Sequence, residues 1–327
     1  MTSIQTFDFQ ALLDNLPNEL VLTSHVNPDG DGLGAMFAMG EALKTIGRKI
    51  HYVLDQPVRD YYEVMSEHEH LKFSLPETTE KVGIITFDCG NFDRIALPAE
   101  FQKLDYTLVN LDHHLSNDLF ADYNLVITDS PASCALVFEV LKHMQIDITQ
   151  SMATALYMGI MYDTGRFAYS KDPYVFEVAA ELLKLNADHW LVYSALFRHN
   201  SFTDFLTIGE LYSLMKQHEQ GKLVTLDIDQ GLSPKINLEE TENLINQISN
   251  IKDLEVVIVF KYLSENLTKI SFRSRGTVDV CELAQSVGGG GHRNASGALM
   301  SHSFEESKAI IMKRAKKIIS KSTGQPN

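Results

Sequence analysis

The first half of the chain alternates short apolar runs with segments of helical spacing. Continuous apolar runs at 20–25, 49–54, 82–88 and 106–112, and a shorter one at 124–128, predict strands. Apolar residues recur with helical spacing over 33–46, 132–143 and 152–162. Strands that are apolar throughout and alternate with helices are typical of a parallel sheet covered on both faces. We therefore expect an α/β domain with a doubly wound, mainly parallel sheet.

The second half predicts a smaller α/β domain. The pattern is helical from 173 to about 217, and we place the connection between domains there. Strands are expected at 222–227, 255–262 and 268–273, and helices at 238–248, 280–287 and 305–319. We thus divide the chain into an N-terminal domain over 1–190, a helical connection over 191–220 and a C-terminal domain over 221–327. Ligands of such sheets bind beyond the C-terminal strand ends, so we expect the active site in the cleft between the domains.

Length and composition narrow the class of protein. The 327 residues exceed what one core usually holds, which favours two domains. No apolar run reaches the ~18 residues that a membrane span needs, and the polar start Met1–Gln10 does not resemble a signal peptide. The three cysteines are far apart in the sequence, which fits a reducing compartment. These features predict a cytoplasmic protein with no membrane partner.

The net charge is −15, which argues against a protein that binds long duplex nucleic acid by bulk attraction. The charge is uneven, however. From Glu255 onward there are 11 Lys/Arg and 6 Asp/Glu, whereas the preceding residues carry 17 and 37. An acidic part could hold metal ions and a basic part an anionic substrate. A solvated surface with a basic last helix is the alternative, and the composition leaves both open.

Polar residues stand where the predicted strands of the first domain end. They are His25, Asp29 and Asp31 after the first strand, Asp88 at the end of the third, Asp112, His113 and His114 at the end of the fourth, and Asp163 at a helix end. The ends of parallel strands converge on one edge, so these side chains should share one site. Singly, each aspartate could be a helix cap or a turn residue, and each histidine a core or surface residue. Their joint placement favours function.

Carboxylates at this density repel one another unless a cation offsets them. A ligand set of oxygen and nitrogen without thiolates suits Mn²⁺ best, with Mg²⁺, Co²⁺ or Zn²⁺ also compatible. Two ions about 3.5–4 Å apart would serve in-line displacement at phosphorus. We therefore expect a two-metal phosphoesterase.

The C-terminal domain contains a candidate anion site. It consists of Arg273, Arg275 and the glycine-rich run 289–297, which includes His292. Glycines let the backbone approach a phosphate, and arginine holds phosphate in a bidentate fork. A flexible hinge with exposed arginines is the alternative, but His292 and the two arginines favour the anion site. The aromatic residues Phe92, Phe167 and Tyr169 could stack on bases, although core packing is the preferred role for each.

Five motifs together resemble the DHH phosphoesterase superfamily. They are His25–Asp31 (HVNPDGD), Asp88-Cys89-Gly90, Asp112-His113-His114, Asp163–Phe167 (DTGRF) and the glycine-rich segment with His292, Ala295 and Gly297. The resemblance runs from about Glu19 to the end of the chain. Each motif is weak alone, but five in the same order are specific.

Length and domain pairing are most similar to the NrnA-type subgroup. That resemblance implies hydrolysis of short oligoribonucleotides to mononucleotides, of 3′-phosphoadenosine 5′-phosphate to AMP, or of both. A phosphodiesterase acting on pApA is the alternative, since it would need the same motifs. A non-catalytic nucleotide-binding module is a third possibility, which predicts a damaged metal site. A homodimer is left open.

The resemblance also implies roles for individual residues. His25, Asp29 and Asp88 would hold one Mn²⁺, and Asp31, Asp88, His113 and Asp163 the other. Asp112 would orient a ligand histidine, and His114 would contact the scissile phosphate. The end of the substrate that carries the terminal phosphate and sugar would be bound by Arg273, Arg275, Gly290, Gly291 and His292.

Overall fold

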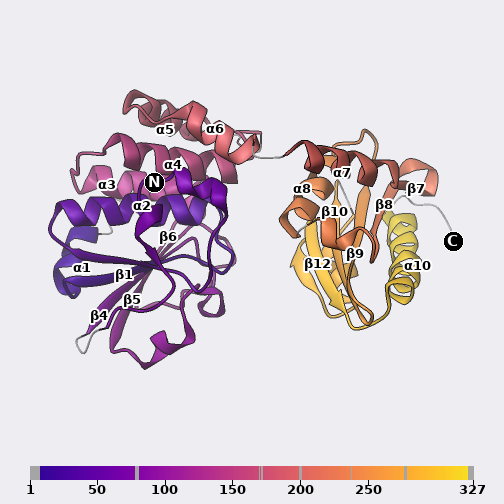
Figure 1. Ribbon diagram of the computed structural model, residues 1–327, viewed down its shortest axis with the longest axis horizontal. Coiled ribbons are helices and arrows are strands. Elements are labelled where there is room, and N and C mark those ends of the chain that lie inside the picture. The colour runs from indigo at the N-terminus through magenta and orange to yellow at the C-terminus, as the bar shows by residue number, and fades with distance from the viewer. Residues whose placement is uncertain are drawn as a thin grey trace. The chain divides into compact units, whose positions relative to one another are not determined.

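The computed structural model describes residues 8–77, 81–168, 170, 172–198, 201–236, 238–275 and 278–322. The chain divides into two units, within residues 1–199 and 200–327 (Figure 1). Helix α6 (His189–Phe197) belongs to the first unit and α7 (Phe202–Ser213) to the second. The range 191–220, which we expected to connect the domains, is therefore divided between the two units. None of the helices in these described ranges is long and apolar enough to cross a membrane.

The first unit is built on a six-stranded sheet in the order β3-β2-β1-β4-β5-β6, and all five strand pairs are parallel. The strands are β1 (Glu19–Thr23), β2 (Lys49–Val53), β3 (Leu71–Lys72), β4 (Val82–Phe87), β5 (Tyr106–Asp112) and β6 (Tyr123–Val126). This order reverses direction between the neighbours β1 and β4. In an open α/β sheet, ligands bind beyond the carboxyl ends of the strands at such a point.

Helices cover one face of this sheet (Figure 1). They are α1 (Phe9–Asn15), α2 (Gly30–Thr45), α3 (Ser133–His143) and α4 (Gln150–Asp163), with α5 (Pro173–Lys184) and α6 outside them. Leu20 and Leu22 of β1 pack against this helical layer. Helices α2 and α4 approach closely at Gly34, where an added Cβ would lie 2.3 Å from the Ala155 carbonyl oxygen. The small residue therefore sets the spacing of two helices that carry site residues.

The opposite face of the sheet packs against the segment that follows β4. Val21 alternates with Leu20 and Leu22 and packs with Ile84, Leu97 and Phe101 on this side. The segment contains two short 3₁₀ helices, η3 (Phe92–Arg94) and η4 (Ala99–Lys103). Two further 3₁₀ helices, η1 (Asp60–Val64) and η2 (His68–His70), lie between β2 and β3. The predicted parallel sheet with both faces covered is thus confirmed.

The second unit has a mixed six-stranded sheet in the order β11-β12-β10-β9-β8-β7. Its strands are β7 (Lys216–His218), β8 (Leu223–Ile228), β9 (Val256–Ser264), β10 (Leu267–Ser274), β11 (Gly290–His292) and β12 (Ala295–Met300). Strands β8 and β9 are parallel, and the other pairs are antiparallel. The sequence did not predict β7, β11 or β12. Strands β7 and β11 have three residues each and no run of large apolar side chains.

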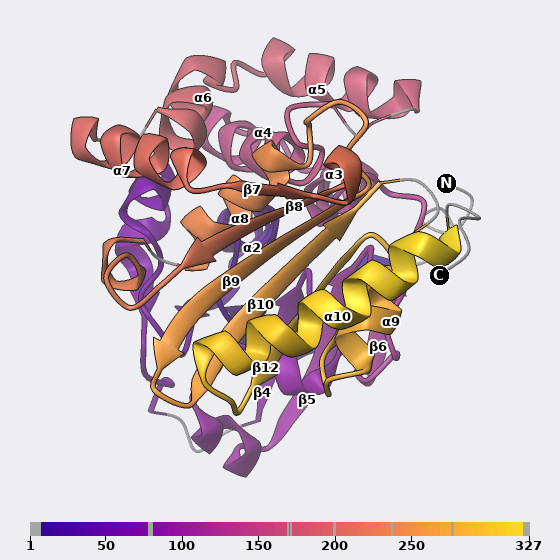
Figure 2. The same ribbon diagram turned by 90° about the vertical axis from the view of Figure 1, so that its right-hand side faces the viewer.

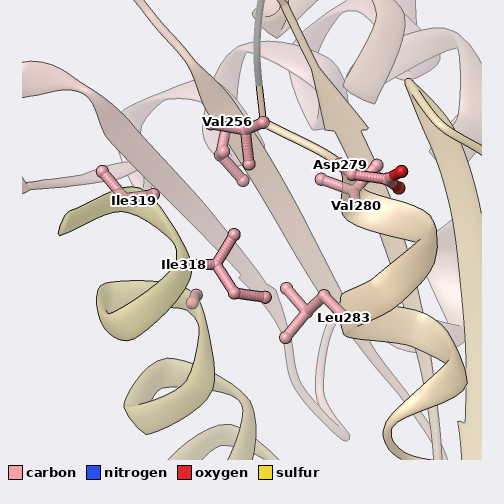
Figure 3. Close-up of a pocket in the computed structure, with 8 residues that line it drawn as sticks. Val256, Asp279, Val280, Leu283, Ile318 and Ile319 are labelled. Atoms are coloured by element: carbon pink, nitrogen blue, oxygen red, sulfur yellow. The ribbon is translucent and has the colours of Figure 1, made fainter. Parts of the chain in front are cut away.

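Helices cover both faces of the second sheet. Helices α7 and α8 (Leu238–Ile248) pack on one face, and α9 (Val280–Gln285) and α10 (Phe304–Ser322) pack on the other. Figure 2 shows α10 in front of the second sheet, running in nearly the same direction as β9 and β10. Between α9 and α10 is an apolar hollow, across which Leu283 and Ile318 face each other (Figure 3). The residues that line it are apolar except Asp279, whose Oδ1 accepts from the amides of Cys281 and Glu282 and whose negative charge would repel a phosphate.

Candidate metal centre

The six predicted metal ligands lie near the carboxyl ends of the first sheet. His25 and Asp29 follow β1, and Asp88 and His113 follow β4 and β5 directly. Asp31 lies in the first turn of α2, and Asp163 is the last residue of α4. The switch point between β1 and β4 therefore has candidate ligands on both sides.

Their donor atoms form three overlapping groups, and in each group the atoms lie within 4.8 Å of one another. The groups are His25, Asp29 and Asp88; Asp31, His113 and Asp163; and Asp88, His113 and His114. The first group contains the three residues of one ligand set that the resemblance implied. The second contains three of the four residues of the other set, and Asp88, the fourth, groups with His113 in the third. These clusters could bind metal ions.

His113 gives the clearest test of whether these residues suit a cation. Its Nδ1 lies 3.1 Å from the Ser130 carbonyl oxygen, which makes Nδ1 the protonated nitrogen and leaves Nε2 as an acceptor. This Nε2 is buried without a hydrogen-bond partner among the described residues. It faces carboxylate oxygens of Asp31, Asp88 and Asp163 at 3.8, 3.5 and 3.6 Å. Donors that share one ion at about 2.1 Å lie no more than about 4.2 Å apart, so the geometry fits a metal.

Asp31, in the first turn of α2, is fully buried against the start of α3. Its two carboxylate oxygens accept from the amides of Ser133 and Cys134, at 2.6 and 2.8 Å, in the first turn of α3. Burial, followed by repulsion from Asp88, Asp163 and Asp29, raises the pKa of Asp31 well above its ordinary range, against the Cys134 hydrogen bond. A cation would relieve this repulsion and restore the charged form.

Asp88 is held at the junction of the groups. Its φ of 59° lies in the left-handed region, which is uncommon for a non-glycine residue. The Ser133 hydroxyl donates to Asp88 Oδ1 at 3.0 Å, and the His25 Nε2 lies 3.5 Å from Oδ2. The next carbonyl, that of Cys89, accepts from the side-chain amides of Asn110 and Asn117. These contacts fix the turn after β4 in a strained conformation, as is common at functional sites.

Asp112 pairs with His114. Its Oδ1 lies 2.7 Å from His114 Nδ1, and its Oδ2 accepts from the Asn117 side chain at 2.6 Å. Burial alone would raise the pKa of Asp112, but the hydrogen bonds from His114 and Asn117 lower it. The resemblance implied that Asp112 orients a ligand histidine. In the structure Asp112 orients the histidine proposed to contact phosphate, while the Ser130 carbonyl orients His113.

Sequence reasoning missed the residues that hold the ligands. Ser130, Ser133 and Asn117 all contact candidate site residues, but serine and asparagine are ordinary turn and cap residues. Ser133 is the first residue of the apolar helix α3, where serine is common. The sequence therefore contained no signal for its contact with Asp88.

In the second unit, strand pairing brings the anion-site candidates together. Arg273 of β10 and His292 of β11 both pair with Ala295 of the intervening β12. Arg273 Nε donates to Asn246 at 2.9 Å, and Arg275 donates to Asn250 at 3.3 Å. The side chain of His292 lies outside the described part of the chain. The glycine run is thus part of a hairpin and not a free loop.

The glycines of this hairpin differ in their need for glycine. Gly291 has φ 137°, and an added Cβ would lie 2.6 Å from the Ala295 carbonyl oxygen, so the backbone requires glycine there. Nothing lies within 4 Å of a Cβ added at Gly290, which is exposed. Gly290 thus leaves its backbone open to approach.

The aromatic candidates of the first unit pack on other rings. Phe92 contacts Phe101 and Phe120 with ring centroids 5.8 and 6.3 Å apart, and Phe167 stacks on Phe176 at 5.5 Å. Tyr169 lies outside the described residues. Core packing, the preferred role, accounts for the first two.

Comparison with known proteins decides the family. The model of the DHH family N-terminal domain matches residues 19–160, and that of the DHHA1 domain matches 220–321. The chain belongs to the DHH superfamily. This DHH protein is 28% identical to the Thermus thermophilus "bifunctional oligoribonuclease and PAP phosphatase NrnA" over 292 residues, 88% of this chain and 86% of that protein. It is also 28% identical to the Mycoplasma genitalium protein of the same name, covering 92% and 94% of the two chains.

A solved structure shares the fold of this DHH protein. It is described as an exopolyphosphatase-related protein from Bacteroides fragilis, with a TM-score of 0.83 and 22% identity over 96% of this chain and 95% of that one. At this identity the similarity supports the two-domain fold alone. The fold class and family expected from the sequence are both confirmed.

Proposed function

We propose that this DHH hydrolase is a two-metal phosphoesterase that cleaves short oligoribonucleotides to mononucleotides, 3′-phosphoadenosine 5′-phosphate to AMP, or both. The observation that supports this most strongly is the buried His113 Nε2, which has no hydrogen-bond partner in the described part of the chain and faces three carboxylates. The names of the two relatives support the substrate class, and this chain matches each of them over at least 86% of that relative's length. A non-catalytic module would be expected to have lost such a site, whereas all six ligand positions of this chain carry an aspartate or a histidine.

His25, Asp29 and Asp88 would hold one ion, and Asp31, Asp88, His113 and Asp163 the other. Mn²⁺ suits these oxygen and nitrogen donors best, with Mg²⁺ or Co²⁺ also compatible. When bound, the ions supply Lewis acidity and lower the pKa of water for attack on phosphorus. The protein's part is to hold carboxylates from separate strands in one place.

The remaining residues would bind and orient the substrate. Asp112 occupies His114 Nδ1, which leaves Nε2 for a phosphate oxygen. Hydrogen bonds from such a donor stabilise charge that develops on phosphoryl oxygens. Arg273, Arg275, Gly290, Gly291 and His292 would bind the terminal phosphate and sugar of the substrate.

The test is turnover of a substrate panel by the whole chain in Mn²⁺, with bound metal measured in parallel. The panel contains a five-nucleotide RNA, 3′-phosphoadenosine 5′-phosphate and pApA. We expect about two metal ions per chain and turnover of the RNA, the nucleotide or both. Strong preference for pApA would replace the proposed substrate, and intact nucleotide binding without metal would exclude the enzyme.

A further inference from the structure

Arg94 lies beside the candidate metal centre although no predicted motif contains it. It is the last residue of η3, and its Nη2 lies 3.2 Å from Nδ1 of His25. The backbone around it is tied to the first motif. The Val26 amide donates to the Arg94 carbonyl at 2.7 Å, and the Ala96 amide donates to the Ser24 carbonyl at 2.9 Å. His25 forms a bridge with Ile95 between these bonds. Arg94 is therefore held in a fixed position beside a candidate ligand.

Arg94 and the Val26 carbonyl compete for Nδ1 of His25. Nδ1 lies 3.0 Å from the Val26 carbonyl and 3.2 Å from Arg94, and it can donate to the first or accept from the second. If His25 Nε2 binds an ion, Nδ1 carries the hydrogen and donates to Val26. Arg94 would then face an N–H group, and its exposed guanidinium could donate to water or to a bound anion instead.

The charge of the centre indicates what that acceptor is. The four carboxylates of Asp29, Asp31, Asp88 and Asp163 balance the charge of two divalent ions, so a phosphodiester adds negative charge that the ligands do not offset. Arg94 is exposed, and its described contacts include no carboxylate. A guanidinium fork matches the oxygens of a phosphate in charge and geometry.

We infer that Arg94 binds a non-bridging oxygen of the scissile phosphate when the metals are bound. This inference rests on the proposed function, because it takes the phosphate ester as the substrate of the metal centre. Arg94 would be a catalytic residue contributed by the segment after the second motif, and it would stabilise charge on the phosphoryl group during attack.

The experiment compares three variants of the whole chain. Arg94→Gln removes the cation, and Arg94→Lys keeps a charge but loses the fork. Lys103→Gln is the matched control, because it removes one positive charge from the exposed surface of the neighbouring helix η4. Three quantities are measured for each: Mn²⁺ affinity, binding of orthophosphate to the Mn²⁺-loaded protein by calorimetry, and kcat/KM for a five-nucleotide RNA.

Arg94→Gln should lower kcat/KM about 100-fold and weaken orthophosphate binding about 10-fold. For Arg94→Lys, kcat/KM and orthophosphate affinity should lie between those of Arg94→Gln and the wild type. For Lys103→Gln, both should equal the wild-type values. Mn²⁺ affinity should be unchanged in all three, because the Val26 carbonyl, which each variant retains, still orients His25 through Nδ1.

Two results would overturn the inference. One is phosphate binding and turnover in Arg94→Gln equal to those of Lys103→Gln. The other is a loss of Mn²⁺ affinity that parallels the loss of activity, because Arg94 would then act by positioning His25. Orthophosphate binding that depends on Arg94, without cleavage of any panel substrate, would support the role of Arg94 and reject the proposed substrate class.

Discussion

The Ser133 hydroxyl donates a 3.0 Å hydrogen bond to Oδ1 of Asp88, a residue 45 positions earlier in the chain. The amide of the same serine donates to Asp31. One residue at the start of α3 thus orients two candidate ligands, one from α2 and one from the turn after β4. Outer contacts of this kind fix the direction of ligand lone pairs.

Replacing Ser133 with alanine should therefore weaken Mn²⁺ binding by roughly 10- to 100-fold. Activity should recover at high Mn²⁺ concentration, because no ligand is lost. Calorimetric titration with Mn²⁺ and the Mn²⁺ dependence of kcat measure this. Ser130→Ala is the control, since its hydroxyl donates to the Ala132 carbonyl and its own carbonyl, which contacts His113, is retained. Equal Mn²⁺ affinities in the two variants would contradict the role of Ser133.

Gly159 of α4 lies against the same residues. A Cβ added there would lie 2.2 Å from Cys134 Sγ and 2.8 Å from Asp31 Oδ1. Gly159→Ala should lower the free energy of unfolding by about 1–3 kcal/mol and also weaken metal binding, because Asp31 must move. Gly209 of α7 has nothing within 4 Å of an added Cβ, so Gly209→Ala should leave stability equal or raise it by up to about 1 kcal/mol. Urea unfolding monitored by circular dichroism measures the free energy of unfolding of both variants.

The hairpin of the second unit contains one glycine that the backbone requires, Gly291, and one that we propose binds the substrate, Gly290. Gly291→Ala should destabilise the second unit, because its φ and the Ala295 carbonyl exclude a Cβ. Gly290→Ala should change stability by less than about 0.5 kcal/mol, as at an ordinary surface site. If Gly290 lies against the substrate, this variant should raise KM several-fold at unchanged kcat. Normal KM in a folded Gly290→Ala variant would remove Gly290 from the substrate site.

Asp227 of β8 accepts from Lys216 at 3.0 Å and from Lys308 of α10 at 2.8 Å. Burial raises the pKa of Asp227, but the hydrogen bonds from Lys308 and Lys216 lower it below its ordinary value. A carboxylate with a depressed pKa stabilises the folded state above its unfolded pKa of about 4, and this stabilisation is lost as the pH falls through the folded value.

Asp227→Asn should accordingly lower the free energy of unfolding by about 1–2 kcal/mol at pH 7. The difference from the wild type should stay constant down to about pH 4 and shrink below it. Thermal unfolding from pH 3 to pH 7 measures this, with Glu265→Gln, an exposed residue of the same unit, as the control. A difference that persists unchanged at pH 3 would show that the charge of Asp227 is not responsible.

The sequence predicted most of the architecture because the central strands of the first unit, β1, β4 and β5, are mostly buried and largely apolar. The prediction for β5 matched the structure residue for residue, and α8 was also predicted at its observed bounds. The expected strand at 20–25 was too long, since β1 ends at Thr23 and His25 forms a bridge with Ile95. That contact joins segments 70 positions apart, and no local pattern encodes it.

The candidate ligands were predictable because strand ends are visible in sequence and parallel strands end at one edge. The residues that contact and orient these ligands were not predictable from the sequence. Ser133 and Arg94 act through long-range contacts made by residue types that are common on any surface. The hairpin of β11 and β12 was missed for a related reason. Glycines at 289 and 291 satisfy close backbone contacts that depend on the partner strand, which the glycine run does not reveal.

The candidate ligands are spread along the chain from His25 to Asp163, the last residue of α4. During synthesis, a nascent chain that ends before residue 163 contains five of the six and lacks the last carboxylate of one group. The set is complete only once residue 163 has been translated. Ion binding at this centre should therefore be coupled to folding of the first unit, since such sites rarely exist in an unfolded chain.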